Sequence, residues 1–171
     1  PYSLLLDLFS GKVFRPATHT LVKGDNYIVL PLYGIKSKEK FVFEKSGLNQ
    51  WNAGGRERDF GEIYIPIPID IHKEYPFFFP ARDVHFDLEI PTGEVFEAKV
   101  CQENSKALMT NPNRALSDWL LRTVLQLKEG ELATIEKLDE LGFDSVVLTK
   151  SKEGIFKIDI MKSSSYESFW N

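Results

Sequence analysis

The sequence predicts a mainly β domain with a few short helices, an α+β fold whose sheet is closed or nearly closed. Short segments rich in β-branched and aromatic residues dominate residues 27–109, and Gly, Pro and Asn separate them. Two further segments of this kind end the chain as a hairpin across residues 151–154. Many short strands expose many edges, and closing the sheet is the economical way to protect them.

The predicted strands are short, and several alternate apolar with polar residues. Val84, Phe86, Leu88 and Ile90, for example, alternate with polar residues, as expected for a strand with one buried face. In chain order, the predicted strands are residues 27–30, 41–43, 63–67, 84–90, 95–101, 107–109, 145–149 and 155–160.

Three helices are predicted from capping residues and helical spacing. The first runs over residues 70–75, with Asp70 as its cap and a proline after its end. The second follows residues 111–113, where an asparagine cap and an early proline suit a helix start. The third begins after Thr134 and ends at Gly142, which suits the left-handed stop position.

The size and composition indicate one globular domain. The chain has 171 residues, of which 43% are hydrophobic and 27% charged. We divide it into an N-terminal linker or strand extension (1–26), a barrel-like domain (27–162) and a C-terminal tail (163–171). Cys101 is the only cysteine, so an internal disulfide and a cysteine-based zinc site are excluded. No apolar run approaches the roughly 20 residues of a membrane span, so we expect a soluble, cytoplasmic protein without an export signal.

The net charge of −4 at first argues against a nucleic-acid partner. The charges are unevenly distributed, however. Residues 1–128 carry 16 acidic and 16 basic side chains, whereas residues 129–171 carry 9 acidic and 5 basic ones. The acidic run from Glu129 to Asp144 is interpreted as a solvated helical face. The sequence therefore allows a local basic surface in the first three quarters of the chain.

The loop at residues 45–62 places amide, guanidinium and indole groups between glycines. Asn and Gln side chains match the N6/N7 edge of adenine, and arginine matches guanine O6/N7 or a phosphate. The alternative is a polar surface hairpin with a glycine-rich tip. We assign Gln50, Asn52 and Arg56 as candidate base readers, and expect Trp51 to pack against Phe60.

A second polar loop, residues 102–106, falls between two predicted strands. If both loops project from the same edge of a barrel, they form two arms separated by a groove that can embrace a duplex through its major groove. Taken alone, the second loop is an ordinary hairpin turn. Lys45, Arg58 and Lys106 are the candidate phosphate contacts.

The search for catalytic motifs gives one enzyme hypothesis. No hydrolase triad motif, phosphate-binding loop or His-x-Lys pair of the phospholipase-D type is present. Asp87, Glu97 and Lys99 have the order of residues that hold magnesium in many nucleases, but solvated strands produce the same pattern by chance. A protein-interaction module that uses the two loops is the third hypothesis. We expect no catalytic residue, metal or cofactor in this chain alone.

Four blocks around the two loops carry a family resemblance: GLNQWNAGGR (47–56), GEIYIPIP (61–68), AKVCQ (98–102) and KALMTNP (106–112). They resemble the C-terminal domain of NgoFVII-type, BfiI-like restriction endonucleases, over roughly residues 25–160. In that family an N-terminal phospholipase-D-like nuclease domain cuts DNA without a metal, and the C-terminal domain recognises the target. That domain resembles the DNA-binding pseudobarrel of plant B-three transcription factors, which has about seven strands.

The resemblance implies a B-three-like pseudobarrel that recognises double-stranded DNA in bacteria. Residues 45–59 would be its N-arm and residues 102–106 its C-arm, and both would grip the major groove. The nuclease domain of the same polypeptide would be its partner and is not in this chain. The candidate DNA-binding residues are Lys45, Ser46, Asn49, Gln50, Trp51, Asn52, Arg56, Arg58 and Asp59 in the N-arm, with Gln102, Glu103, Asn104, Ser105 and Lys106 in the C-arm.

Overall fold

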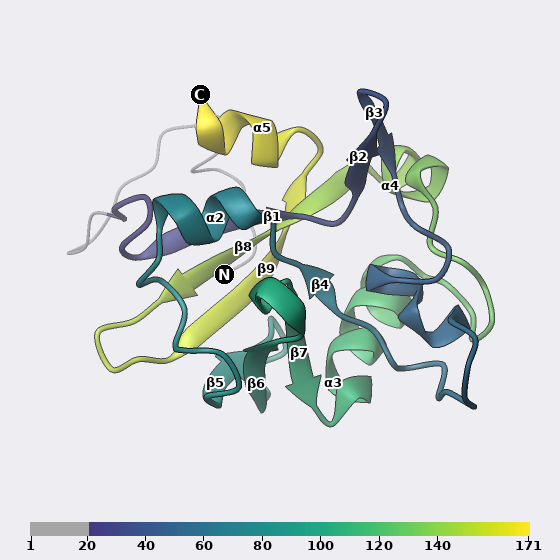
Figure 1. The fold of residues 1–171 in the computed structure, drawn as a ribbon, viewed down its shortest axis with the longest axis horizontal. Coiled ribbons are helices and arrows are strands. Elements are labelled where there is room, and N and C mark those ends of the chain that lie inside the picture. Colours follow the sequence, from purple (N-terminus) through teal and green to yellow (C-terminus); the bar gives the residue numbers. More distant parts are fainter. Residues whose placement is uncertain (1–20) are drawn as a thin grey trace.

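A computed structural model describes residues 21–171, and most of the predicted N-terminal extension (1–26) lies outside them. The described chain forms one seven-stranded sheet in the order β1-β8-β9-β5-β6-β7-β4 (Figure 1). A separate two-stranded hairpin projects beside it. The strands of the large sheet are β1 (Tyr27–Pro31), β4 (Ile65–Pro66), β5 (Phe86–Glu89), β6 (Val95–Cys101), β7 (Ala107–Asn111), β8 (Phe143–Lys150) and β9 (Phe156–Lys162), and the hairpin consists of β2 (Gly34–Lys36) and β3 (Glu39–Phe41).

One parallel pairing joins the two halves of the large sheet. All neighbouring strands pair antiparallel except β5 and β9, which run parallel with Leu88 opposite Phe156. The first and last strands of the order, β1 and β4, lie against each other. The sheet is therefore nearly closed, and the prediction of a mainly β, barrel-like fold with short helices is confirmed.

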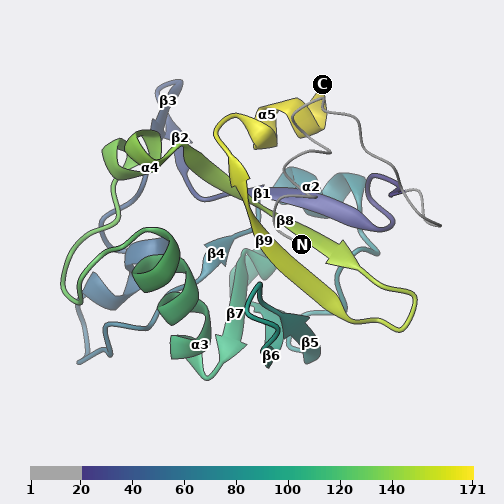
Figure 2. The same ribbon diagram turned by 180° about the vertical axis from the view of Figure 1, so that it is seen from behind.

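Short helices cover the ends of this sheet. Figure 2 shows β1, β8 and β9 crossing the back of the molecule, with the C-terminal helix α5 above them. The helices are η1 (Gly47–Asn52), α2 (Ile69–Glu74), η2 (Glu103–Ser105), α3 (Asn113–Ser117), η3 (Asp118–Val124), α4 (Ile135–Leu141) and α5 (Ser165–Trp170). η1 and η2 are 3-10 helices, and η3 is a single π-helical segment that continues α3.

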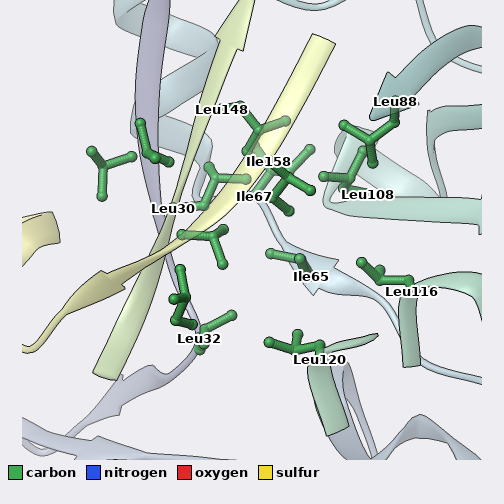
Figure 3. Packing of buried hydrophobic residues seen from close by; sticks show 14 of the residues in the cluster. Leu30, Leu32, Ile65, Ile67, Leu88, Leu108, Leu116, Leu120, Leu148 and Ile158 are labelled. Atoms are coloured by element: carbon green, nitrogen blue, oxygen red, sulfur yellow. The ribbon is translucent and has the colours of Figure 1, made fainter. Parts of the chain in front are cut away.

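The core is filled by branched aliphatic side chains from both halves of the sheet (Figure 3). Ile63, Ile65 and Ile67 are all at most 3% exposed, as their alternation predicts, although only Ile65 and Pro66 join the ladder with β7. Leu30 and Leu148 enter from the opposite half of the sheet. Burying several such side chains, each worth about 1.5 to 3 kcal/mol, stabilises a single closed core.

Two local predictions are wrong in detail: one strand ends before its predicted residues, and one helix begins before its predicted cap. The strand predicted at residues 41–43 ends at Phe41. The ring of Phe43 instead lies over Gly34, where a Cβ atom would approach it to 2.2 Å. The predicted helix at residues 70–75 begins at Ile69 with Pro68 at its N-cap, so Asp70 lies in the first turn. There its carboxylate still favours the positive end of the helix dipole.

Of the two remaining helix predictions, one is wrong about its cap and the other is confirmed. α3 begins after Pro112, with no side-chain cap, in place of the predicted asparagine cap. The hydroxyl of Thr110 accepts the Leu116 amide at 3.3 Å and satisfies one free donor of that turn. The predicted boundaries of α4 are confirmed. Thr134 caps it by accepting the Lys137 amide, and Gly142 ends it with φ of +77°.

The acidic run contains one member that is not solvated. Asp144 is 1% exposed, which contradicts its interpretation as part of a solvated face. Its carboxylate accepts from Lys40 Nζ at 3.1 Å and from Ser145 Oγ at 2.7 Å. Lys40 also pairs with Glu167 of α5 at 2.5 Å. A buried charge must be paired to be tolerated, and here the pairing ties β3, β8 and α5 together.

Replacing this buried carboxylate tests its role in the fold. We expect Asp144→Asn to lower the free energy of unfolding by about 2 to 4 kcal/mol, because charge-assisted bonds are lost in a buried site. Glu140→Gln is the matched control, since Glu140 is exposed in the same acidic run. Urea unfolding of both variants measures the difference. Equal stability of the two variants would contradict the assignment.

Candidate DNA-binding surface

The base of the N-arm is fixed by a buried amide. Asn49, in η1, is 0% exposed. Its Nδ2 donates to the carbonyls of Phe43 at 2.9 Å and Ala133 at 2.8 Å, and its Oδ1 accepts the Ala133 amide at 2.9 Å. Asn49, one of the predicted DNA contacts, is thus buried in the structure, where its side chain joins the N-arm to the segment before α4.

The two arginines of the N-arm meet at one carboxylate. Arg56 and Arg58 both pair with Oε1 of Glu62, the second at 3.4 Å. Arg58 also donates from Nε to the Ala53 carbonyl at 3.1 Å, and its side chain is 16% exposed. The Arg56 side chain is 59% exposed. Arg58 thus lies inside the arm, whereas Arg56 is presented at its surface.

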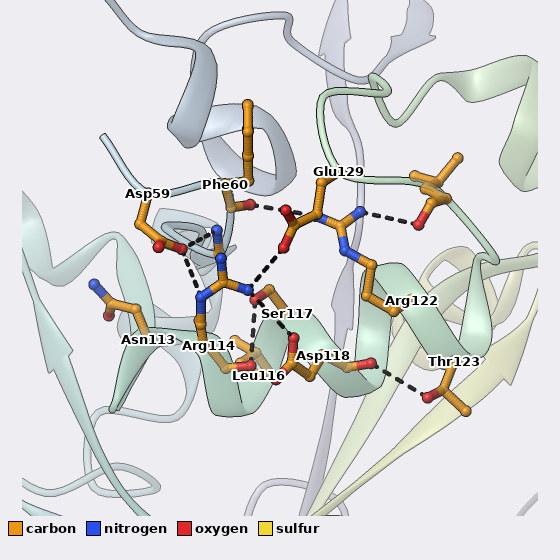
Figure 4. A network of polar contacts seen from close by, with 12 residues as sticks. Asp59, Phe60, Asn113, Arg114, Leu116, Ser117, Asp118, Arg122, Thr123 and Glu129 are labelled. Atoms are coloured by element: carbon orange, nitrogen blue, oxygen red, sulfur yellow. Dashed lines mark hydrogen bonds and ion pairs between the residues drawn. The ribbon is translucent and has the colours of Figure 1, made fainter. Parts of the chain in front are cut away.

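A cluster of polar contacts around Arg114 of α3 holds the end of the N-arm (Figure 4). Arg114 pairs with Asp59 at 2.9 Å and with Glu129 at 3.0 Å. Nearby, Arg122 donates to the carbonyl of Phe60 at 3.4 Å. Asp59, predicted to contact DNA, therefore already has a cationic partner within the protein.

Close packing also holds the arm to α3. The rings of Trp51 and Phe60 meet edge to face with centroids 5.4 Å apart, which confirms the predicted packing. Gly61 faces Arg114 and Ser117, and a Cβ atom there would lie 2.5 Å from Arg114 Cγ. The chain can pass this close to α3 at residue 61 because glycine has no side chain.

The C-arm has an unusual backbone. Gln102, Asn104 and Ser105 all have positive φ, between 53° and 69°. Each such residue costs on the order of 1 kcal/mol, so neighbouring contacts must hold the loop. His72 of α2 donates from Nε2 to the Ser105 carbonyl at 2.7 Å, and the Ile67 amide donates to the Lys106 carbonyl at 2.8 Å.

The register of β4 and β7 places the two arms relative to each other. These strands are antiparallel, with Ile65 opposite Leu108 and Pro66 opposite Ala107. The N-arm leads into the start of β4, and the C-arm leads into the start of β7. The two arms therefore lead into this strand pair from its opposite ends. Figure 1 shows the N-arm projecting at the right, beyond α3.

A groove of about 470 Å³ lies on the outer face of β6 and β7, beside the base of the C-arm. Gln102 of the C-arm lines one part of it, and Asn113, the first residue of α3, lines another. Glu97, Lys99 and Met109 line its floor, while Val100 belongs to the core on the other side. This alternation is the period-two pattern of a strand with two different faces.

Sequence reasoning missed most residues of this groove, among them His85, Asn111 and Asn113. The alternation within residues 95–101 and 107–111 was the available signal, since it places the odd-numbered residues on one face. The floor is polar but its charges are paired. His85 pairs with Glu97, and Lys99 pairs with Asp83 at 3.5 Å.

The same pairs bear on the nuclease alternative. Asp87 and Glu97 do lie opposite each other in the register of β5 and β6. However, Glu97 and Lys99 are each engaged with another partner, His85 and Asp83. Within residues 21–171, no three His, Cys, Asp or Glu side chains gather closely enough to hold a metal ion.

The predicted contact residues differ in accessibility. Gln50 is half-buried, and its Oε1 atom is covered without a hydrogen-bond partner in the described chain. Asn52 is exposed, and its Nδ2 donates to the Glu44 carbonyl at 3.0 Å. The exposed candidates are Lys45, Asn52, Arg56, Asp59, Glu103, Asn104 and Lys106, and the half-buried ones are Ser46, Gln50, Trp51, Arg58, Gln102 and Ser105.

A nearly closed seven-stranded sheet with short helices is the architecture of a B3-like pseudobarrel. Residues 25–152 match the model of the NgoFVII C-terminal B3-like DNA-binding domain. Because the match spans most of the chain, this protein belongs to that family, whose members are DNA-binding domains of restriction endonucleases.

Comparisons with curated proteins and with solved structures do not extend this assignment. A search of curated proteins gave no significant match. Among solved structures, the chain is similar to a hypothetical protein of Arabidopsis thaliana, with 11% identity and a TM-score of 0.38 over 82% of this chain and 94% of that one. This similarity is too low to support a conclusion. No helix in the described part of the chain is long and apolar enough to cross a membrane.

Removing the buried amide tests its structural role. We expect Asn49→Ala to lower the free energy of unfolding by about 2 to 4 kcal/mol, because it leaves main-chain groups of Phe43 and Ala133 buried without partners. Asn52→Ala, which removes an exposed amide of the same helix, should change stability by less than about 0.5 kcal/mol. Urea unfolding measures both. If Asn49→Ala were as stable as Asn52→Ala, the hydrogen bonds of the buried Asn49 side chain would not contribute to stability.

Proposed function

We propose that this domain recognises a specific sequence in double-stranded DNA, with its N-arm and C-arm entering the major groove from the two ends of the outer sheet face. The observation that carries the proposal is the pair of polar loops that lead into β4 and β7 from opposite ends of this strand pair, with Gln102 of the C-arm lining the groove on β6 and β7. Family membership supports DNA as the ligand.

Under this proposal, some side chains of the arms contact DNA bases and others contact phosphates. Arg56 is exposed and offers the guanidinium fork that matches guanine, and Asn52 offers an amide for adenine. Lys45 and Lys106 are exposed cations placed to contact phosphates. Arg58 is better explained as an internal brace, because its guanidinium already bonds Ala53 and Glu62.

We further propose that the domain serves as the target-recognition part of a type II restriction endonuclease. The support is the family, which consists of C-terminal DNA-binding domains of such enzymes. Cleavage would then belong to a phospholipase-D-like nuclease domain of the same polypeptide. The role of this chain would be to choose the site on bacterial DNA.

Selection from a random pool of duplexes tests the function and reports the target. We expect one sequence to be enriched, with affinity that falls steeply as salt rises. Arg56→Ala should reduce discrimination at one base pair by about 1 to 3 kcal/mol. Lys106→Ala should weaken binding to all duplexes similarly and reduce the salt slope by about one.

The control is Lys152→Ala, which removes a cation from the turn between β8 and β9 and should leave binding unchanged. Binding is measured by fluorescence anisotropy over a series of salt concentrations. Equal affinity of the wild-type domain for all duplexes would refute the proposal.

A further inference from the structure

Glu62 stands at the base of the N-arm and is one of the few buried acidic groups in the described chain. The residue is 9% exposed, and its side chain 12%. A single oxygen, Oε1, pairs with both Arg56 Nη2 and Arg58 Nη1. A carboxylate this well covered requires cationic partners, because burying it unpaired is costly.

The two arginines bound to Glu62 differ in exposure and in how firmly the protein holds them. Arg58 is braced a second time by the Ala53 carbonyl, so it stays with Glu62 in the absence of any ligand. Arg56 is mostly exposed, and its second contact is a 3.3 Å bond from Nη1 to the Glu57 carbonyl. A guanidinium has five N–H donors, so the contact with Glu62 leaves donors of Arg56 available to a ligand.

We propose that Glu62 is a specificity-determining positioning residue: it holds the guanidinium of Arg56 so that a matching base engages it and a stray phosphate does not. The inference rests on the proposed function. A free arginine binds any phosphate, which is the main source of non-specific affinity. An arginine already paired with a buried carboxylate gains little binding energy from a single phosphate. Glu62 therefore lowers the affinity for DNA that offers Arg56 a phosphate but no matching base.

The charge of the arm agrees with this role. Residues 45–62 contain three basic side chains and three acidic ones. Two of the three acids, Asp59 and Glu62, are paired with arginines. Glu57 is exposed and has no ion pair in residues 21–171. The loop at residues 45–62 is therefore neutral as a whole, and the carboxylate of Glu62 holds both of its arginines.

The central test compares Glu62→Gln with Glu57→Gln, which removes the same charge from the residue next to Arg56. Dissociation constants are measured for the selected duplex and for a scrambled duplex of equal composition, over a series of salt concentrations. We expect Glu62→Gln to bind the scrambled duplex about 3- to 10-fold more tightly, with a salt slope steeper by about one, as one more phosphate contact requires. Selectivity should fall by at least the same factor, and Glu57→Gln should change it less than twofold.

Two further variants separate positioning from net charge. Glu62→Asp keeps the charge but withdraws the carboxylate by one methylene, so it should shift binding in the same direction as Glu62→Gln. In an Arg56→Ala background, Glu62→Gln should have no further effect on selectivity. Urea unfolding of each variant confirms that the folded domain is being measured.

The outcomes distinguish this inference from the proposed function. If the wild-type domain binds the selected and scrambled duplexes equally, the proposed function fails. If it is selective but Glu62→Asp behaves as the wild type while Glu62→Gln and Glu57→Gln behave alike, only the role of Glu62 is overturned. The same holds if Glu62→Gln acts equally with and without Arg56.

Discussion

The parallel pairing of β5 with β9 is the contact on which the rest of this domain depends. On one side of it lie β1, β8 and β9, and on the other lie β5, β6, β7 and β4. Phe86 and Phe156, one from each strand, pack with ring centroids 4.5 Å apart directly beside this junction. Because the two halves are joined here, β1 can reach β4 and close the core, and β6 and β7 can present their outer face.

Both arms are held by polar side chains that bond to the main chain or to charges at the arm bases. Asn49 joins the N-arm to residue 133, Arg114 holds it at Asp59, and His72 holds the C-arm at Ser105. Side-chain bonds of this kind suit irregular loops, because such loops lack the repeating main-chain ladder that stabilises strands and helices. The arms keep a defined shape without being part of the sheet.

The sequence was sufficient for the features that depend on local chemistry. The alternation of Ile63, Ile65 and Ile67 predicted their burial, and Thr134 and Gly142 marked the two ends of α4. Features that depend on distant partners were not readable. Asn49 and Asp144 look like surface residues in sequence, and only the positions of Ala133 and Lys40 in the fold explain their burial.

The same limit applies to the candidate site. Loop composition identified both arms, since amides, guanidiniums and glycines gathered there. It did not predict that Arg58 is less exposed than Arg56. The bond from Arg58 to the Ala53 carbonyl depends on the folded shape of the arm, which composition does not reveal. Nor did it place the groove, whose lining depends on how β6 and β7 pair.

The tip of the N-arm is structurally independent of its anchors. A Cβ atom at Gly54 would meet nothing within 4 Å, whereas one at Gly61 would collide with Arg114. A substitution at Gly54 is thus nearly neutral for folding, while one at Gly61 is not. Under the proposed function, such a division would let a lineage of these domains acquire new DNA targets through a few tip substitutions, without first having to repair the scaffold.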